Sequence, residues 1–180
     1  MEFRRIVTGY DDAGKSVILS DGQPATSHDF NHTPEMHVSL LWTTAPDQSV
    51  GKPETDPTDS VTCWTPAPGG SVAMVVVFPP DSVMMAPDFD PLAAGGEFLG
   101  KLPGFACKFE AKNPGFHTTD TVDYGILLDG ELIMELDDGT TTLVKKHDVI
   151  VQNGTRHAWR NRSDKPVPVL FVLVGANRIS

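Results

Sequence analysis

Short apolar runs divided by turn signals fill the last third of the chain, residues 122–174. The runs are interrupted by DG at 129–130, by DDG at 137–139 and by NG at 153–154. Asp and Asn tolerate positive φ and Gly has no Cβ to clash, so each of these signals is typical of a β-hairpin turn. No run of helical period longer than about three turns competes with the strands. The pattern therefore predicts an all-β fold, either a barrel or a jelly roll.

The first two thirds of the chain predict further strands of the same fold. Residues 3–20 contain two extended runs around the turn signal YDDAGK, residues 36–45 form a third β-prone run, and residues 71–80 are apolar enough for a buried strand. Between them, residues 46–70 are rich in Pro, Asp and Thr and are expected to cross the surface as a linker. Residues 78–104 have a loop-like sequence with room for one helical turn.

The length of 180 residues suits one structural domain with a sizeable core. Within it we expect residues 71–180 to form the barrel, and residues 1–70 to supply N-terminal strands and the linker that pack on it. Cys63 and Cys107 are too few for a disulfide framework and lack the spacing of a zinc site. We therefore expect a core without disulfides and two free thiols.

Charge and hydropathy argue against several classes of partner. The chain carries 14 Lys and Arg against 24 Asp and Glu, a formal net charge of −10, which opposes binding to a phosphate backbone. No apolar run approaches the roughly 18 residues that cross a membrane, and the N-terminus lacks the apolar segment of a secretory signal. We therefore expect a cytoplasmic protein whose partner is a small molecule, with neither nucleic acid nor membrane involved.

Alternation along the strands predicts which side chains share a face. Asp123 and Leu127 point to one face of their strand, and further along the chain His157, Trp159 and Asn161 share a face. Two histidines and a carboxylate on the inward faces of neighbouring strands would be enough to hold a metal ion and to leave positions open for water or substrate.

The region before residue 130 resembles the first motif of the cupins, small β-barrels that bind a metal through two histidine-bearing motifs. That motif reads G, five residues, H-x-H, three or four residues, E, six residues, G. Its final glycine resembles Gly130, which places Asp123 at the glutamate position, His117 at the first histidine and Thr119 at the second.

The second cupin motif ends in H, three residues, N, and His157 and Asn161 match it. The resemblance covers residues 105–175, whereas the first hundred residues hardly share in it. It implies a cupin-type double-stranded β-helix, which is a jelly-roll barrel, with an N-terminal strand extension.

The resemblance also implies a metal centre with a reduced set of ligands. Thr119 stands in place of one histidine and Asp123 in place of the glutamate, which leaves His117, Asp123 and His157 as ligands of one divalent ion. Such a set of two histidines and one carboxylate holds Fe(II) in oxygenases and also accepts Zn, Mn or Ni, so the identity of the metal stays open. A metal-free barrel that has lost part of the motif is the alternative.

Other side chains near the motifs are candidates for catalysis or for substrate binding. Asp120 and Glu131 are candidate proton carriers if the fold brings them within reach of the substrate. Phe116 and Trp159 suit a substrate wall and the core equally well. The candidate substrate contacts are Phe116, Thr119, Trp159 and Asn161.

We therefore expect a metal-dependent enzyme that acts on a small organic molecule in the barrel. The resemblance implies dioxygenation, decarboxylation, isomerisation or cyclisation, and the ligand set favours an oxidoreductase. A non-catalytic cupin module that binds a small ligand is the second hypothesis, because the same barrel serves both roles. A structural or partner-binding protein is the third.

The face opposite Asp123 predicts how the chain assembles. It is expected to be apolar and to carry Val122, Tyr124, Ile126, Leu128, Leu132, Met134 and Leu136. A face this apolar does not lie against water, so we expect it to be covered by the strands of residues 3–20 and 36–45, by the same strands of a second copy, or by both. Closed two-fold dimers are the commonest oligomers, which favours a homodimer.

Overall fold

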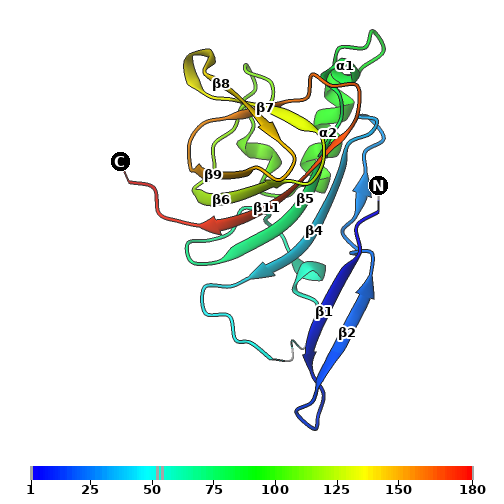
Figure 1. Cartoon of the computed structure of the whole chain (residues 1–180), viewed down its shortest axis with the longest axis vertical. Helices are drawn as coiled ribbons and strands as arrows, with labels where there is room; N and C mark the ends of the chain where they lie inside the picture. Colours follow the sequence, from blue (N-terminus) through cyan, green and yellow to red (C-terminus); the bar gives the residue numbers. More distant parts are fainter. Residues whose placement is uncertain (1, 52, 54, 180) are drawn as a thin grey trace.

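Two antiparallel sheets form the body of the protein (Figure 1). The structure is a computed structural model that describes residues 2–51, 53 and 55–179. The larger sheet has six strands in the order β3 (His28–Asp29), β4 (His37–Thr44), β5 (Ser71–Phe78), β11 (Val167–Gly175), β6 (Thr121–Leu127) and β9 (Val149–Asn153). The smaller sheet has three, in the order β10 (Ala158–Arg160), β7 (Glu131–Glu135) and β8 (Thr141–Lys145). The predicted all-β jelly roll is confirmed.

The turn signals of the last third of the chain have two different uses. The DDG turn at 137–139 joins β7 to β8, which pair with each other, and is a true hairpin. The turns at 129–130 and 153–154 also contain a glycine with positive φ, but each carries the chain from the larger sheet to the smaller one. Only one of the three signals therefore marks a hairpin, because a turn sequence does not specify with which strand the next strand pairs.

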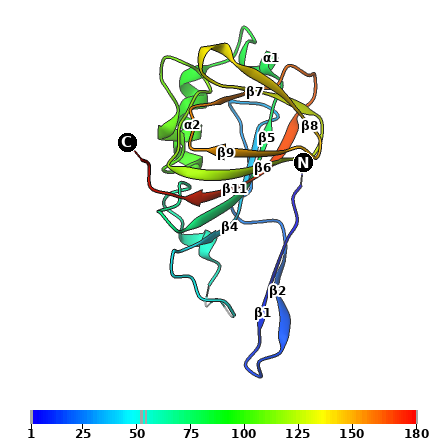
Figure 2. The same ribbon diagram turned by 60° about the vertical axis from the view of Figure 1, so that its left-hand side comes forward.

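The N-terminal residues divide into a separate hairpin and a part of the main sheet. Strands β1 (Arg5–Tyr10) and β2 (Ser16–Gly22) pair only with each other among the described residues, and their hairpin extends away from the body in both views (Figures 1 and 2). Strand β4 pairs with β5 along its length, and Met36, Val38 and Leu40 enter the core. Residues before 70 thus supply two strands of the main sheet itself, β3 and β4.

Helices occupy only a small part of the described chain. They are α1 (Asp81–Met84), α2 (Pro91–Lys101) and the 3₁₀ turns η1 (Pro57–Ser60), η2 (Ala106–Lys108) and η3 (Asp137–Gly139). The loop predicted for residues 78–104 is wrong over α2, which has 11 residues. Asp90 caps this helix by accepting hydrogen bonds from the N–H groups of Leu92 and Ala93. Within the described ranges, no helix has the length and hydropathy needed to cross a membrane.

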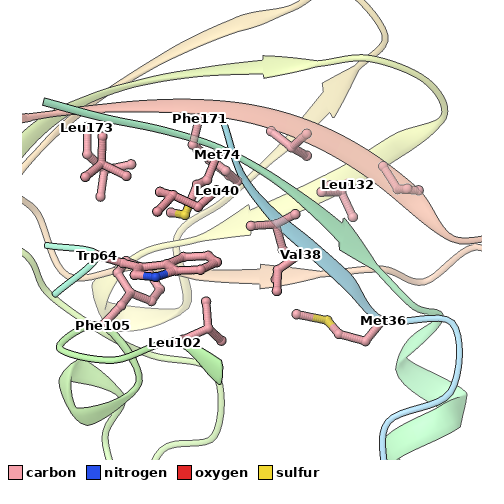
Figure 3. Packing of buried hydrophobic residues seen from close by; sticks show 14 of the residues in the cluster. Met36, Val38, Leu40, Trp64, Met74, Leu102, Phe105, Leu132, Phe171 and Leu173 are labelled. Carbon is pink, nitrogen blue, oxygen red and sulfur yellow. The ribbon is translucent and has the colours of Figure 1, made fainter. Parts of the chain in front are cut away.

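The inner faces of the two sheets enclose the hydrophobic core (Figure 3). In the larger sheet, the register places Leu40, Met74, Phe171 and Gly125 side by side across four strands. A Cβ at Gly125 would lie only 3.1 Å from the Phe171 ring, so the ring occupies the space that a side chain at this position would need. Asp123 lies two residues before Gly125 on the same inner face and is thereby brought to the wall of the core.

The face that β7 turns to the core differs from the sequence prediction. Leu132 is buried in the core (Figure 3), and Met134 packs against the core. We expected both on the face opposite Asp123. That expectation is wrong because the turn at 129–130 moves the chain to the smaller sheet, and Leu132 of β7 then enters the same core cluster as Leu127 of β6. Tyr124 does lie opposite Asp123 and is 45% exposed.

Candidate functional site

Two buried histidines form the centre of the candidate site. His117 precedes β6 and His157 precedes β10, and the two residues exchange both backbone hydrogen bonds, with N···O distances of 3.0 and 3.1 Å. Residues paired in this way project their side chains to the same side. The centroids of the two imidazoles are 4.3 Å apart. The main chain therefore holds the two rings together.

Each imidazole is fixed in one tautomer by a main-chain carbonyl. The Nδ1 of His117 donates to Gly115 O at 3.1 Å and the Nδ1 of His157 donates to Thr155 O at 3.0 Å, since a carbonyl oxygen only accepts. Burial and, to a smaller extent, repulsion by His157 together lower the pKa of His117 to about 4, and burial also lowers the pKa of His157. Both rings are therefore neutral at pH 7, with a lone pair on each Nε2.

Asp123 points inward from β6 and has a carboxylate oxygen without a partner. The residue is 6% exposed, and its neighbours across the sheet are Leu173 of β11 and Gln152 of β9. Its Oδ1 is buried and accepts no hydrogen bond from the described residues. Burial raises the pKa of Asp123 to about 6, against the opposite effect of a hydrogen bond with Thr121. Because an uncompensated buried carboxylate is costly, the position suits a bound cation or a ligand that donates a hydrogen bond.

A cavity of about 500 Å³ brings these side chains together. His117, Asp123 and His157 all line it. Most of the remaining wall is apolar and is made by β4 and the loop before it, β5, β10, β11, α2 and the segment that follows α2; prominent members are Met36, Met74, Phe98, Phe105, Trp159 and Phe171. A largely apolar cavity of this size with a few convergent polar groups is typical of a small-molecule site.

The three predicted ligands share the cavity without forming a closed cluster. Within residues 2–51, 53 and 55–179, no three His, Cys, Asp or Glu side chains are grouped closely enough to hold a metal ion. The chemistry of the donors does fit a divalent ion, because the hydrogen bonds of both neutral imidazoles are made by Nδ1, which leaves Nε2 as the donor, and because one oxygen of the buried Asp123 carboxylate lacks a partner among the described residues. Coordination by all three would require their side chains to come closer together.

Comparison with known proteins identifies the family. The Cupin domain model matches residues 110–173, which contain both histidines. Phomopsin biosynthesis cluster protein D of Diaporthe leptostromiformis is 32% identical over 162 residues, which are 88% of this chain and 70% of that protein. The chain belongs to the cupin superfamily.

Two further cupins resemble the chain over a shorter segment or at lower identity. A cupin-domain-containing oxidoreductase of Aspergillus ruber, fogC, is 33% identical over 66 residues, which are 35% of this chain and 32% of that protein. The Cnp3 cupin domain of Schizosaccharomyces pombe covers 97% of this chain and 89% of its own, with a TM-score of 0.45 and 11% identity. That superposition is too loose to support a functional comparison.

Two predicted substrate contacts of this cupin line the cavity. Trp159 forms part of the wall beside the histidine pair. Asn161 also lines the cavity, but its Nδ2 donates to Phe78 O and Lys165 O at 2.9 and 2.8 Å, and its Oδ1 accepts from the N–H and hydroxyl of Ser163. The asparagine of the cupin motif therefore fastens the loop after β10 and has no free polar group to offer a substrate.

The other two predicted substrate contacts lie outside the cavity wall. Phe116 is not among the lining residues, and its ring packs against the guanidinium of Arg156, 3.8 Å from the ring centroid. Thr119, at the second histidine position of the cupin motif, is buried, and its Oγ1 accepts a hydrogen bond of 2.7 Å from Thr121. Both residues pack around the site without facing the space that a ligand would fill.

The two predicted proton carriers also lie away from the cavity. Asp120 pairs with Arg178 at 2.5 Å near the C-terminus, and Glu131 is an exposed residue at the start of β7. Neither side chain lines the cavity. Asp120 thus ties down the segment after β11, and we assign neither residue a part in catalysis.

Sequence reasoning missed the part of the wall that comes from residues 33–36 and from α2 and the turn after it. Thr33 and Met36 lie in the loop before β4, and Phe98, Leu102 and Phe105 line the cavity from α2 and beyond. The spacing of these last three, at i, i+4 and i+7, is that of an amphipathic helix and was the available signal. No local pattern indicated Thr33.

Asp123→Asn is expected to stabilise the metal-free protein at pH 8 and to have a smaller effect at pH 4.5. The pKa of Asp123 is raised from 3.8 to about 6 in the folded state, so the wild-type protein loses stability as the pH rises from the lower of these values to the higher, and the full loss is present at pH 8. Asparagine stays neutral at both pH values. The titration of His117 affects the stability of the wild type and of the variant in the same way, so it does not contribute to the difference between them. We expect a gain in the free energy of unfolding of about 1–2 kcal/mol at pH 8.

Urea unfolding of chelator-treated protein at the two pH values measures this difference. Asp120→Asn, at an exposed ion pair, is the matched control and should show no such gain at pH 8. An equal effect of Asp123→Asn at both pH values would contradict the ionisation of Asp123 inside the cavity.

Proposed function

We propose that this cupin is a metal-dependent oxidoreductase that acts on a small organic molecule held in the cavity. The proposal is carried by the pair of neutral imidazoles, whose rings lie 4.3 Å apart with each Nδ1 tied to the main chain. Asp123 adds an unpartnered carboxylate oxygen at the wall of the same cavity. Two imidazoles and one carboxylate are the donor set that holds Fe(II), and it also accepts Zn, Mn and Ni.

The roles of the residues follow from their positions. His117 and His157 would hold one divalent ion through Nε2, and Asp123 would hold it through its carboxylate. When bound, such an ion supplies Lewis acidity and, if it is redox active, electrons for dioxygen chemistry. Trp159 and Phe171, with ring centroids 5.9 Å apart, offer apolar surfaces that orient a flat substrate. The apolar wall limits the access of water to the polar groups.

The relatives support the class of reaction. The A. ruber relative is named an oxidoreductase, and the D. leptostromiformis relative is named as a protein of a biosynthesis cluster. We extend both descriptions to this chain and propose oxidation of a small molecule during its biosynthesis. Isomerisation, cyclisation and decarboxylation would use the same ion as a Lewis acid, without consumption of dioxygen.

Metal analysis tests the first part of the proposal. Protein purified without added metal is expected to contain close to one Fe, Mn, Ni or Zn ion per chain, or to retain one after anaerobic loading and removal of excess ion. A site that none of these ions fills would favour the alternative, a non-catalytic module that binds a small ligand.

Nitric oxide, used in place of dioxygen, tests the oxidoreductase class. Fe(II)-loaded protein whose ion has open positions is expected to bind nitric oxide and to give an electron paramagnetic resonance signal. Fully loaded protein that gives no signal would contradict dioxygen chemistry and would favour the Lewis-acid reactions.

A further inference from the structure

Two buried side-chain polar atoms of the described residues have no hydrogen-bond partner, and both belong to residues that line the cavity. One is Asp123 Oδ1, and the other is the Oγ1 of Thr33. Thr33 is 2% exposed and precedes β4, in a loop far from the histidines in sequence. A buried hydroxyl without a hydrogen-bond partner costs free energy. A hydroxyl of this kind in a cavity wall is therefore suited to form a hydrogen bond with a ligand.

The main chain around Thr33 is held firmly. Glu97 of α2 accepts hydrogen bonds of 2.9 Å from the N–H groups of Asn31 and His32, and Thr33 O accepts from Met36 N at 3.1 Å. Rotation about the Cα–Cβ bond of Thr33 therefore exchanges its methyl and hydroxyl groups at the wall without moving the loop. The hydroxyl can turn into the cavity when a ligand offers it a partner.

The charges on the wall favour a neutral ligand. Arg160 is the one cationic side chain among the lining residues, and its Nε already donates to Glu135 at 2.7 Å. The carboxylates of Asp81 and Asp123 line the same cavity. Apart from the proposed metal ion, a carboxylate or phosphate on the ligand would find no unpaired cation among the lining side chains and would meet the carboxylate of Asp81.

The apolar part of the wall favours a ring system. It contains six aromatic side chains, Phe78, Phe98, Phe105, Phe109, Trp159 and Phe171. Aromatic walls contact flat rings edge-on and face-on over large areas, and four methionines at the same wall adapt to irregular shapes.

We propose that Thr33 is a specificity-determining residue that hydrogen-bonds the ligand, and that this ligand is a neutral, largely apolar molecule with a ring system and a carbonyl or hydroxyl oxygen. The inference rests on the proposed function in that it concerns the same cavity. It specifies the class of substrate and adds a polar contact that neither cupin motif contains.

Fluorescence binding of prodan, a neutral naphthyl ketone, tests the proposal in chelator-treated full-length protein. Prodan emission moves to longer wavelength when its carbonyl oxygen accepts a hydrogen bond. Thr33→Val removes the hydroxyl at nearly constant volume and is expected to weaken prodan binding about fivefold to tenfold and to shift the bound emission to shorter wavelength. Thr33→Ser keeps the hydroxyl and is expected to retain the wild-type emission.

Two controls separate this contact from a general effect on the fold. An analogue in which a methylene replaces the carbonyl should bind wild type and Thr33→Val within about twofold. Thr58→Val changes another buried threonine, whose hydroxyl donates a hydrogen bond to Asp56 away from the cavity. This change should lower the thermal midpoint of unfolding and leave the affinity for prodan unchanged. Thr33→Val should not lower the midpoint, because it removes an unsatisfied hydroxyl.

Three results would overturn the inference. They are equal binding of prodan by wild type and Thr33→Val, no saturable binding of prodan by wild type, and tighter binding of the corresponding naphthyl carboxylate than of the ketone. Because the assay contains chelator, these results are independent of metal content. A protein that fails to take up metal but shows the Thr33 effect would contradict the proposed function alone.

Discussion

Removal of either imidazole is expected to empty the metal site. His117→Ala and His157→Ala should each weaken binding of the divalent ion at least about a hundredfold, so that protein purified without added metal loses most of its ion. The reason is that the two Nε2 atoms are the donors that the fold already brings together, through mutual backbone hydrogen bonds of 3.0 and 3.1 Å. Asp123 alone supplies too few donors for tight binding.

Metal analysis and equilibrium dialysis with Fe(II), Mn(II), Ni(II) and Zn(II) measure the effect. His32→Ala is the matched control, because it removes an exposed imidazole outside the cavity and should leave metal content unchanged. Near-ultraviolet circular dichroism checks that each variant keeps its tertiary packing. Wild-type metal content in a folded His117→Ala or His157→Ala protein would refute the assignment of these ligands.

The members of this site could be predicted from the sequence because they lie in short motifs. His117 and Asp123 are six residues apart at the start of β6, and His157 follows the turn after β9. Alternation along one strand was enough to place Asp123 on an inner face. The same rule failed for Leu132, since a turn at 129–130 changed sheets and no local signal distinguishes a turn between sheets from a hairpin.

The wall of the cavity could not be predicted because it depends on contacts between distant segments. Glu97 receives hydrogen bonds from Asn31 and His32, more than 60 residues earlier in the chain. Three glycines within α2 lower the intrinsic helix propensity of that segment, and the helix forms with an Asp90 cap and with Phe98 packed on the core. Tertiary packing thus outweighs the local preference that favoured a loop.

Assembly is expected to depend on the projecting hairpin of β1 and β2. A two-stranded hairpin is at best marginally stable alone in water. In this chain the hairpin stands away from the body, and its Ile6 and Ile18 are 51% and 61% exposed (Figures 1 and 2). The outer face of the larger sheet is also apolar, with Tyr124 of β6 and Val151 of β9 cross-strand neighbours and both exposed. The hairpin of the same chain does not cover that face.

We propose that a second copy provides the cover, with the hairpin of each protomer on the outer face of the larger sheet of its partner. In a dimer with two-fold symmetry, each hairpin covers the outer sheet face of the other protomer. The exposed apolar residues of both protomers are then buried in one closed interface. In such a dimer the hairpin, which few residues of its own chain contact, packs against the partner. Cleaving only residues 1–22 removes the hairpin and leaves β4, which is part of the main sheet, in place.

Light scattering at low micromolar concentration is expected to show a dimer for the full chain and a monomer for the chain that lacks residues 1–22. Ile18→Asp and Val151→Asp, one on each side of the proposed contact, should each dissociate the dimer, since a charge buried in an apolar interface is costly. Leu92→Asp is the control, because Leu92 lies on α2 and is 86% exposed outside this surface. A full-length monomer would refute the dimer, and a dimer that survives both charge substitutions would place the interface elsewhere.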